Sequence, residues 1–140
     1  MASHVIELTI NNNLDLDVTY QSDWFDSGGL SAGSSFPKTI AANSTATIKM
    51  QDKASTAKGC SGYVNYLADG GDVTFAYSNP SIGTNKLGVG NSGKGVWDNM
   101  GSHDYAPFTE EFSIGGRVCK ANCICTGGET NQASVTLAWA

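Results

Sequence analysis

The chain has 140 residues, of which 40% are hydrophobic and 15% charged, with 17 glycines and 3 prolines. This composition predicts one domain over residues 1–140, built from many short strands joined by glycine turns, and it argues against disorder and long surface helices. The formal net charge of −5 argues against nucleic acid as a partner. A zwitterionic membrane surface, a neutral sugar or another protein remains compatible with that charge.

The N-terminal residues lead directly into an apolar alternation and show no signal-peptide features. We therefore expect a cytoplasmic or non-classically secreted protein, or an extracellular one if Met1 starts a mature chain. No apolar run approaches the roughly 20 residues of a membrane-spanning helix, so any membrane contact is expected to be peripheral. Oligomerisation is left open.

Four cysteines are present, and three of them lie close together in the sequence, at Cys119, Cys123 and Cys125. Reduced thiols at strand ends or in loops are the expectation. A disulfide from Cys60, or a zinc site completed by Cys60 or His103, remains an alternative. We expect that folding requires no bound metal, nucleotide or covalent cofactor.

Alternation of apolar and polar residues, which is typical of half-buried strands, appears first in residues 5–10 and 14–20. The three asparagines between them favour a turn, so these strands are predicted to form a hairpin. A loop-rich passage and a strand over residues 44–50 follow. Residues 62–67 and 73–77 predict a second hairpin, because Asp69 and Gly70 begin a strong turn signal.

The second half of the chain contains less regular patterns. Residues 83–95 carry five glycines and predict a loop or a bulged edge strand. A single short helix is plausible only within residues 98–107, and closing strands are predicted over 111–118 and 133–139. The expected fold is therefore a two-sheet β-sandwich with at most one or two short helices.

The sequence contains a glycine-rich stretch that suggests nucleotide binding and two histidines that could serve in catalysis, but neither feature has the surroundings that such a site requires. Residues 88–95 match glycine-rich phosphate-binding loops, but Gly95 stands where a hydroxyl is needed and no helical pattern follows Lys94. Of the two histidines, His4 is terminal and His103 lies in a loop. Nothing in the sequence points to catalysis by Cys60 with His103, the one alternative pairing, and we expect no enzyme.

Aromatic residues are more informative, because rings supply large contact areas on lipid headgroups and sugars. Trp24, Trp97 and Tyr105 lie in or near predicted loops and are candidates for an exposed patch. Rings that alternate within predicted strands are expected in the core, as at Tyr63, Phe75 and Trp139.

Residues 62–70, continuing through 75–80 to Asn85, resemble the actinoporins, β-sandwich cytolysins that bind sphingomyelin-containing membranes. The resemblance extends to residues 10–12, 106–108 and 131–138. It implies a lipid-headgroup site of the phosphocholine class, in which Ser78 and Pro80 match the family's serine and proline and Tyr77 precedes them.

The chain departs from the family pattern in three places. The aromatic loop after Pro80 is shortened to residues 81–84 and has no ring. The family's tyrosine-rich helix retains rings only at Trp97 and Tyr105, and the N-terminal amphipathic helix has no counterpart before Val5. We therefore expect a binding module that does not form pores. The alternative is a lectin on the same scaffold, with a sugar site that uses Asp98, Asn99 and Asp104.

Overall fold

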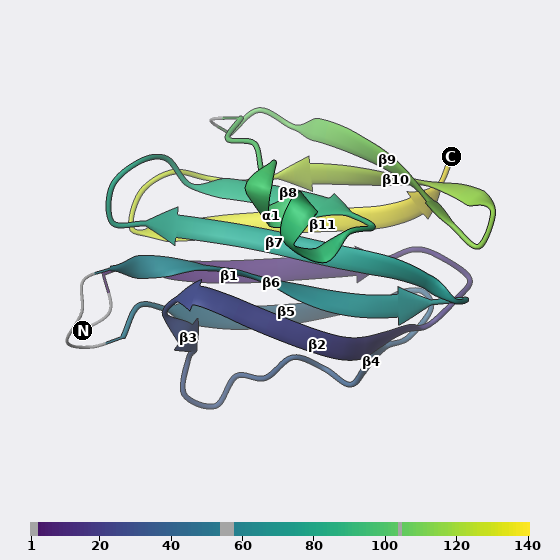
Figure 1. Cartoon of the computed structure of the whole chain (residues 1–140), viewed down its shortest axis with the longest axis horizontal. Helices are drawn as coiled ribbons and strands as arrows, with labels where there is room; N and C mark the ends of the chain where they lie inside the picture. The colour runs from purple at the N-terminus through teal and green to yellow at the C-terminus, as the bar shows by residue number, and fades with distance from the viewer. Residues whose placement is uncertain (1–2, 54–57, 104) are drawn as a thin grey trace.

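Two β-sheets packed face to face make up most of the computed structural model, which describes residues 3–53, 58–103 and 105–140 (Figure 1). The first sheet has six strands, in the order β3 (Gly29–Leu30), β5 (Ser44–Gln51), β1 (Val5–Asn12), β11 (Thr130–Trp139), β10 (Arg117–Ile124) and β9 (Phe108–Ile114). The second has five, in the order β4 (Thr39–Ile40), β2 (Val18–Ser27), β6 (Gly59–Ala68), β7 (Gly71–Pro80) and β8 (Lys86–Gly90). One short helix, α1 (Gly93–Asp98), lies against the second sheet. The predicted two-sheet sandwich is confirmed.

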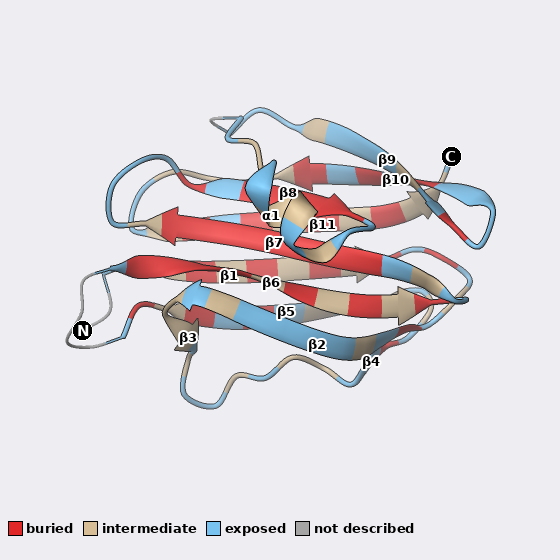
Figure 2. Cartoon of the chain, viewed as in Figure 1, coloured by how far each residue is buried: buried red, intermediate tan, exposed pale blue. Residues whose placement is uncertain are grey.

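The core lies between the two sheets, because alternate side chains of each strand point inward. Strand β7 departs from this alternation, since residues 73–79 are all buried (Figure 2). Val73, Phe75 and Tyr77 belong to the core, whereas the residues between them lie on the outer face and are covered there. Burial on both faces of β7 marks the place where α1 and the β7–β8 loop cover the sheet.

The hairpin predicted for residues 62–77 is confirmed as β6 and β7. Its pairing runs without interruption from Ala68 opposite Gly71 to Gly59 opposite Pro80. Asp69 and Gly70 both have positive φ, 46° and 75°, as the tight turn of a right-twisted hairpin requires.

The hairpin predicted for residues 5–10 and 14–20 is wrong, because β1 and β2 lie in different sheets. Strand β1 pairs with β5 and β11, and residues 13–17 cross to the second sheet. The side-chain amide of Asn12 donates to the carbonyls of Leu16, Ile40 and Ala41. This asparagine ends β1 and ties the crossing segment to the chain before β5.

Three details of residues 83–140 also differ from prediction. The stretch 83–95 contains the predicted edge strand, β8, but helix α1 begins at Gly93 and includes Lys94, where no helix was expected. Residues 98–107, where a helix was considered plausible, are largely irregular. This helix has six residues, too few for the phosphate loop that the sequence resembles. The predicted strand 111–118 in fact spans the turn between β9 and β10.

All four cysteines are buried, near the ends of β6 and β10 and just beyond β10, and none of them forms a disulfide. Burial raises the pKa of the Cys60 and Cys123 thiols to about 12 and that of Cys119 to about 11. The described residues contain no group of three histidine, cysteine or carboxylate side chains that would hold a metal ion. In the same part of the chain, no helix has the length and apolar character needed to cross a bilayer.

Candidate functional site

A pocket of about 380 Å³ lies where α1 and the β7–β8 loop meet the outer face of the second sheet. We call it the serine pocket, after Ser61 on β6 and Ser78 on β7. These two residues face each other across the β6–β7 ladder, so their side chains leave the same face of the sheet. Further lining comes from Pro80, the loop residues 82–84, Lys86 and residues 97, 98 and 100.

Trp97 is fixed over this pocket by a hydrogen bond. Its indole Nε1 donates to the Ser61 Oγ over 2.9 Å. None of the residues of α1 is buried, so the helix depends on contacts of this kind for its position on the sheet. The bond between Trp97 and Ser61 therefore helps to shape the pocket.

Two further rings continue from Trp97 over the second sheet. The ring centroid of Trp24 lies 5.2 Å from that of Trp97 and 5.5 Å from that of Tyr63. Trp24 and Tyr63 are cross-strand partners, and a side chain at the adjacent Gly62 would collide with the carbonyl oxygen of Trp24. Glycine at position 62 thus allows β2 to approach closely. Trp24 is 36% exposed, which leaves an open aromatic surface beside the serine pocket.

The rim of the serine pocket carries both charge signs and one prominent apolar side chain. Lys86 and Asp98 both line the pocket, and Asp98 also pairs with Lys94 over 3.3 Å. Lys94 Nζ in turn lies 5.6 Å from the centroid of the Trp97 ring, which shows that this ring accommodates a cation. Ile82, in the β7–β8 loop, is 91% exposed.

The structure brings together three of the five site residues predicted from the sequence: Ser78, Pro80 and Trp97. Tyr77 does not face the pocket, because neighbouring residues of a strand point to opposite faces and its ring lies fully buried in the core. Tyr105 lies elsewhere, with its Oη 3.5 Å from the carbonyl oxygen of Gly127. Sequence reasoning missed Ser61 and Lys86.

The residues predicted for a sugar site are not gathered in one place. Asp98 lines the serine pocket, whereas the side-chain amide of Asn99 donates to the carbonyl of Gly95 within α1. Asp104 lies outside the described residues. His103 stacks on Phe108, with ring centroids 3.9 Å apart.

Comparison with known proteins identifies the fold. No protein-family profile matches the chain, and no curated protein matches it in sequence. Among solved structures, the lipid-binding protein Nakanori is similar, with a TM-score of 0.80 and 15% identity over 99% of this chain and 72% of that one. The chain has an actinoporin-like fold.

The actinoporin-like fold is shared with proteins of other descriptions. RahU, crystallised in complex with a TRIS molecule, is similar over 100% of this chain and 98% of its own, with a TM-score of 0.63 and 14% identity. A lectin from Xerocomus chrysenteron is similar over 96% of this chain and 99% of its own, with a TM-score of 0.59 and 13% identity. Sequence identities this low establish the fold only and do not identify the ligand of this chain.

Proposed function

We propose that this chain is a non-enzymatic binding module whose serine pocket takes the phosphocholine headgroup of a membrane lipid of the sphingomyelin class. The observation that carries the proposal is the arrangement of Trp97 and the two serines in one pocket. An aromatic ring attracts a quaternary ammonium, with an energy of about 0.5–2 kcal/mol. The adjacent Lys86 carries the charge that a phosphate group needs, so the pocket offers partners to both ends of a zwitterion.

The partner is proposed to be a zwitterionic membrane surface, contacted peripherally. A net charge of −5 opposes approach to anionic lipid and to nucleic acid. Ile82, which is 91% exposed at the pocket rim, would enter the bilayer interface when the headgroup is bound. Full burial of such a side chain is worth about 1.5–3 kcal/mol.

Flotation with vesicles tests the proposal. The chain is expected to float with vesicles of phosphatidylcholine and sphingomyelin, and to be released by free phosphocholine. Ile82→Ser is expected to weaken vesicle binding about 10- to 100-fold, because each 1.4 kcal/mol corresponds to about tenfold in affinity. Binding that is insensitive to phosphocholine, or that is retained in full by Ile82→Ser, would contradict the proposal.

Val118→Ser is the matched control for this experiment. Val118 is also an exposed β-branched residue, at 46%, but it lies near the start of β10 in the other sheet. The two substitutions remove similar apolar groups, so a general effect on solubility or folding would appear in both. Only Ile82→Ser is expected to change the affinity for vesicles.

We expect binding without membrane leakage. Strand β1 is paired along all eight of its residues with both β5 and β11. Withdrawing it would break two ladders and expose its buried side chains, so β1 is unsuited to leave the sandwich. Dye release from sphingomyelin vesicles at saturating protein would contradict this expectation.

A lectin activity is the second candidate, supported by the similarity in fold to the Xerocomus chrysenteron lectin. A glycan array run beside the flotation assay separates the two functions. If the chain binds glycans and does not bind vesicles, the lectin function replaces the lipid proposal.

A further inference from the structure

A second pocket, of about 400 Å³, lies on the other side of the β7–β8 loop. We call it the asparagine pocket, after Asn79 at the end of β7 and Asn85 just before β8. It shares Pro80, Gly83 and Thr84 with the serine pocket, so the loop forms a wall between them. Its volume falls within the range of about 300–1,000 Å³ that is typical of small-molecule sites.

The two asparagines are oriented by bonds to backbone carbonyls. The amide nitrogen of Asn79 donates to the carbonyls of Val5 and Glu129, over 2.9 and 2.8 Å. That of Asn85 donates to the carbonyls of Thr126 and Gly128, over 2.7 and 3.2 Å. Carbonyls only accept, so the nitrogen of each amide is fixed in place and its oxygen must point the other way.

The two carboxamide oxygens are therefore acceptors without donors. Asn79 and Asn85 are only 2% and 7% exposed, and within the described residues neither oxygen receives a hydrogen bond. Neither oxygen is among the buried side-chain atoms that lack a partner, so both are reached by solvent and are open to a ligand that brings hydrogen-bond donors.

His4 adds a third polar side chain to the lining of this pocket. Its Nδ1 lies 2.9 Å from Asp52 Oδ2, and the Ser3 hydroxyl donates to the same oxygen over 3.0 Å. Burial acts to raise the pKa of Asp52, but these hydrogen bonds outweigh it and hold the pKa below its usual range. Because the carboxylate only accepts, Nδ1 carries a proton, and Nε2 is the ring nitrogen left for a ligand.

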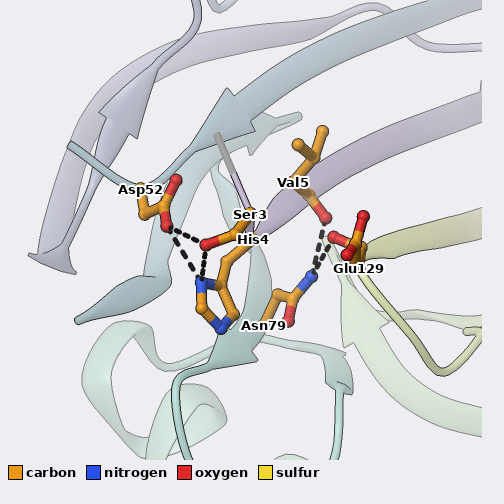
Figure 3. Close-up of polar contacts among 6 residues, drawn as sticks. All are labelled: Ser3, His4, Val5, Asp52, Asn79 and Glu129. Carbon is orange, nitrogen blue, oxygen red and sulfur yellow. Dashed lines mark hydrogen bonds and ion pairs between the residues drawn. The ribbon is translucent and has the colours of Figure 1, made fainter. Parts of the chain in front are cut away.

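Figure 3 shows His4 Nε2 and the Asn79 oxygen on the side that faces away from Asp52 and from the bonded carbonyls. Both residues line the asparagine pocket. Two carboxamide acceptors and a ring nitrogen suit a ligand with several hydroxyls, because a hydroxyl both donates and accepts. Apolar molecules and a quaternary ammonium have no donor, so this pocket does not duplicate the serine pocket.

An exposed ring stands beside this pocket. Tyr105 is 58% exposed, and its Oη lies 3.5 Å from the carbonyl oxygen of Gly127, a lining residue. Its φ of 69° is uncommon for a residue with a side chain. A ring beside a set of hydrogen-bonding groups suits a sugar, which has an apolar C–H face and a rim of hydroxyls.

We infer that the asparagine pocket is a second binding site, for one neutral saccharide ring. The hydroxyls of the sugar donate to the carboxamide oxygens of Asn79 and Asn85 and form a hydrogen bond with His4 Nε2, and its C–H face packs on Tyr105. This site goes beyond the proposed headgroup site, from which it is separated by the β7–β8 loop.

The test is an NMR titration of the full 140-residue chain with methyl glycosides of galactose, mannose, fucose, N-acetylglucosamine and N-acetylgalactosamine. At least one glycoside is expected to shift the side-chain amides of Asn79 and Asn85 and the backbone amides of Gly127 and Gly128, and to saturate. If no glycoside shifts these signals, or if the shifts lie at the serine pocket, the inference is wrong.

Two variants separate this pocket from the other. Ser102 is exposed and lines only the asparagine pocket, so Ser102→Trp fills the pocket without disturbing the core, and sugar binding is expected to be lost. Tyr105→Ala is expected to weaken sugar binding about 2- to 10-fold. Trp24→Ala, beside the serine pocket, is the control and is expected to leave sugar binding unchanged. If Ser102→Trp retains full sugar binding, the inference is overturned.

The source of the sugar is distinguished by presenting the bound glycoside on a lipid carrier and on a protein carrier. Recognition of either carrier supports the site, and recognition of neither contradicts it. Phosphocholine binding is titrated in the same samples. The headgroup proposal and the saccharide inference therefore fail or succeed separately.

Discussion

The hydrogen bond between Trp97 and Ser61 holds α1 over the serine pocket. Its contribution to stability can be measured by removing the Ser61 hydroxyl and the Trp97 indole N–H, singly and together. Ser61→Ala and Trp97→Phe each delete one partner of a 2.9 Å bond and keep most of the side-chain volume. A bond of this kind contributes about 0.5–1.5 kcal/mol, and Ser61 is only 6% exposed, so water replaces Trp97 poorly there.

The expected coupling between the two substitutions is therefore about 0.5–1.5 kcal/mol in the free energy of unfolding. For a chain of this size, each 1 kcal/mol changes the melting temperature by about 2–4 °C. Ser61→Ala is expected to lower both the melting temperature and the affinity for phosphocholine, and to cost less when Trp97 is already phenylalanine.

The assay is a double-mutant cycle by urea unfolding and by titration with phosphocholine. Ser134→Ala, on β11 in the other sheet, controls for the general effect of a serine-to-alanine change in a strand. If Ser61→Ala has the same effect with either residue at position 97, the bond does not stabilise α1 and the reasoning is refuted.

Three further predictions concern the rest of the fold. The pKa of Asp52 is lowered in the folded chain, so its charge stabilises the fold above the ordinary carboxyl pKa of about 4, and this contribution is lost as the pH falls through the folded pKa. Near neutral pH, the Asp52→Asn variant should therefore unfold at a lower urea concentration than the original chain. The difference between the two unfolding midpoints should become smaller at about pH 3 in the same assay. Asn131→Ala removes the three hydrogen bonds of a fully buried side chain and should cost about 2–4 kcal/mol by urea unfolding, whereas Asn122→Ala, at an exposed position, should cost less than about 0.5 kcal/mol. Burial raises the pKa of the Cys60 and Cys119 thiols, so both should react with a thiol reagent only after unfolding, as followed by absorbance in native and denaturing buffer.

The parts of the fold that sequence reasoning predicted are those encoded locally. The hairpin of β6 and β7 combines alternation with a turn whose residues suit positive φ, and both signals lie within one short stretch. The prediction of a first hairpin was wrong because β1 pairs with strands far along the chain, β5 and β11. The asparagines after β1 resemble a turn, but Asn12 instead binds carbonyls of the crossing segment and of residues 40 and 41.

The strand β10 and the helix α1 were missed for different reasons. In β10 the inward positions are occupied by Cys119, Ala121 and Cys123. The cysteines were considered as possible disulfide partners or metal ligands, so their place in an apolar alternation was not recognised. Helix α1 contains two glycines and weak helix formers, and its position depends on contacts of Trp97 that no local pattern encodes.

Three residues that line the serine pocket were named from the sequence, and a fourth could have been. Ser78, Pro80 and Trp97 were named from the family resemblance. Counting outward from the turn at residues 69 and 70 places Ser61 opposite Ser78, so the hairpin register would have identified it. Tyr77 was included although the same alternation directs it into the core. The asparagine pocket combines four distant chain segments, and no local signal marks it.

The parallel pairing of β1 with β11 sets a limit on how the chain folds as it is synthesised. These are the first and last strands, and Val5 pairs opposite Thr130 in the middle of the six-stranded sheet. That sheet cannot close on the ribosome until β11 has emerged, and until then one backbone edge of β1 stays open to other chains. In the second sheet, β6, β7 and β8 can pair as soon as they are synthesised, because they follow one another in sequence and are neighbours in the sheet. Pulse-labelling hydrogen exchange is therefore expected to find β6 and β7 protected before β1 and β11, in a slow reaction governed by long-range pairing.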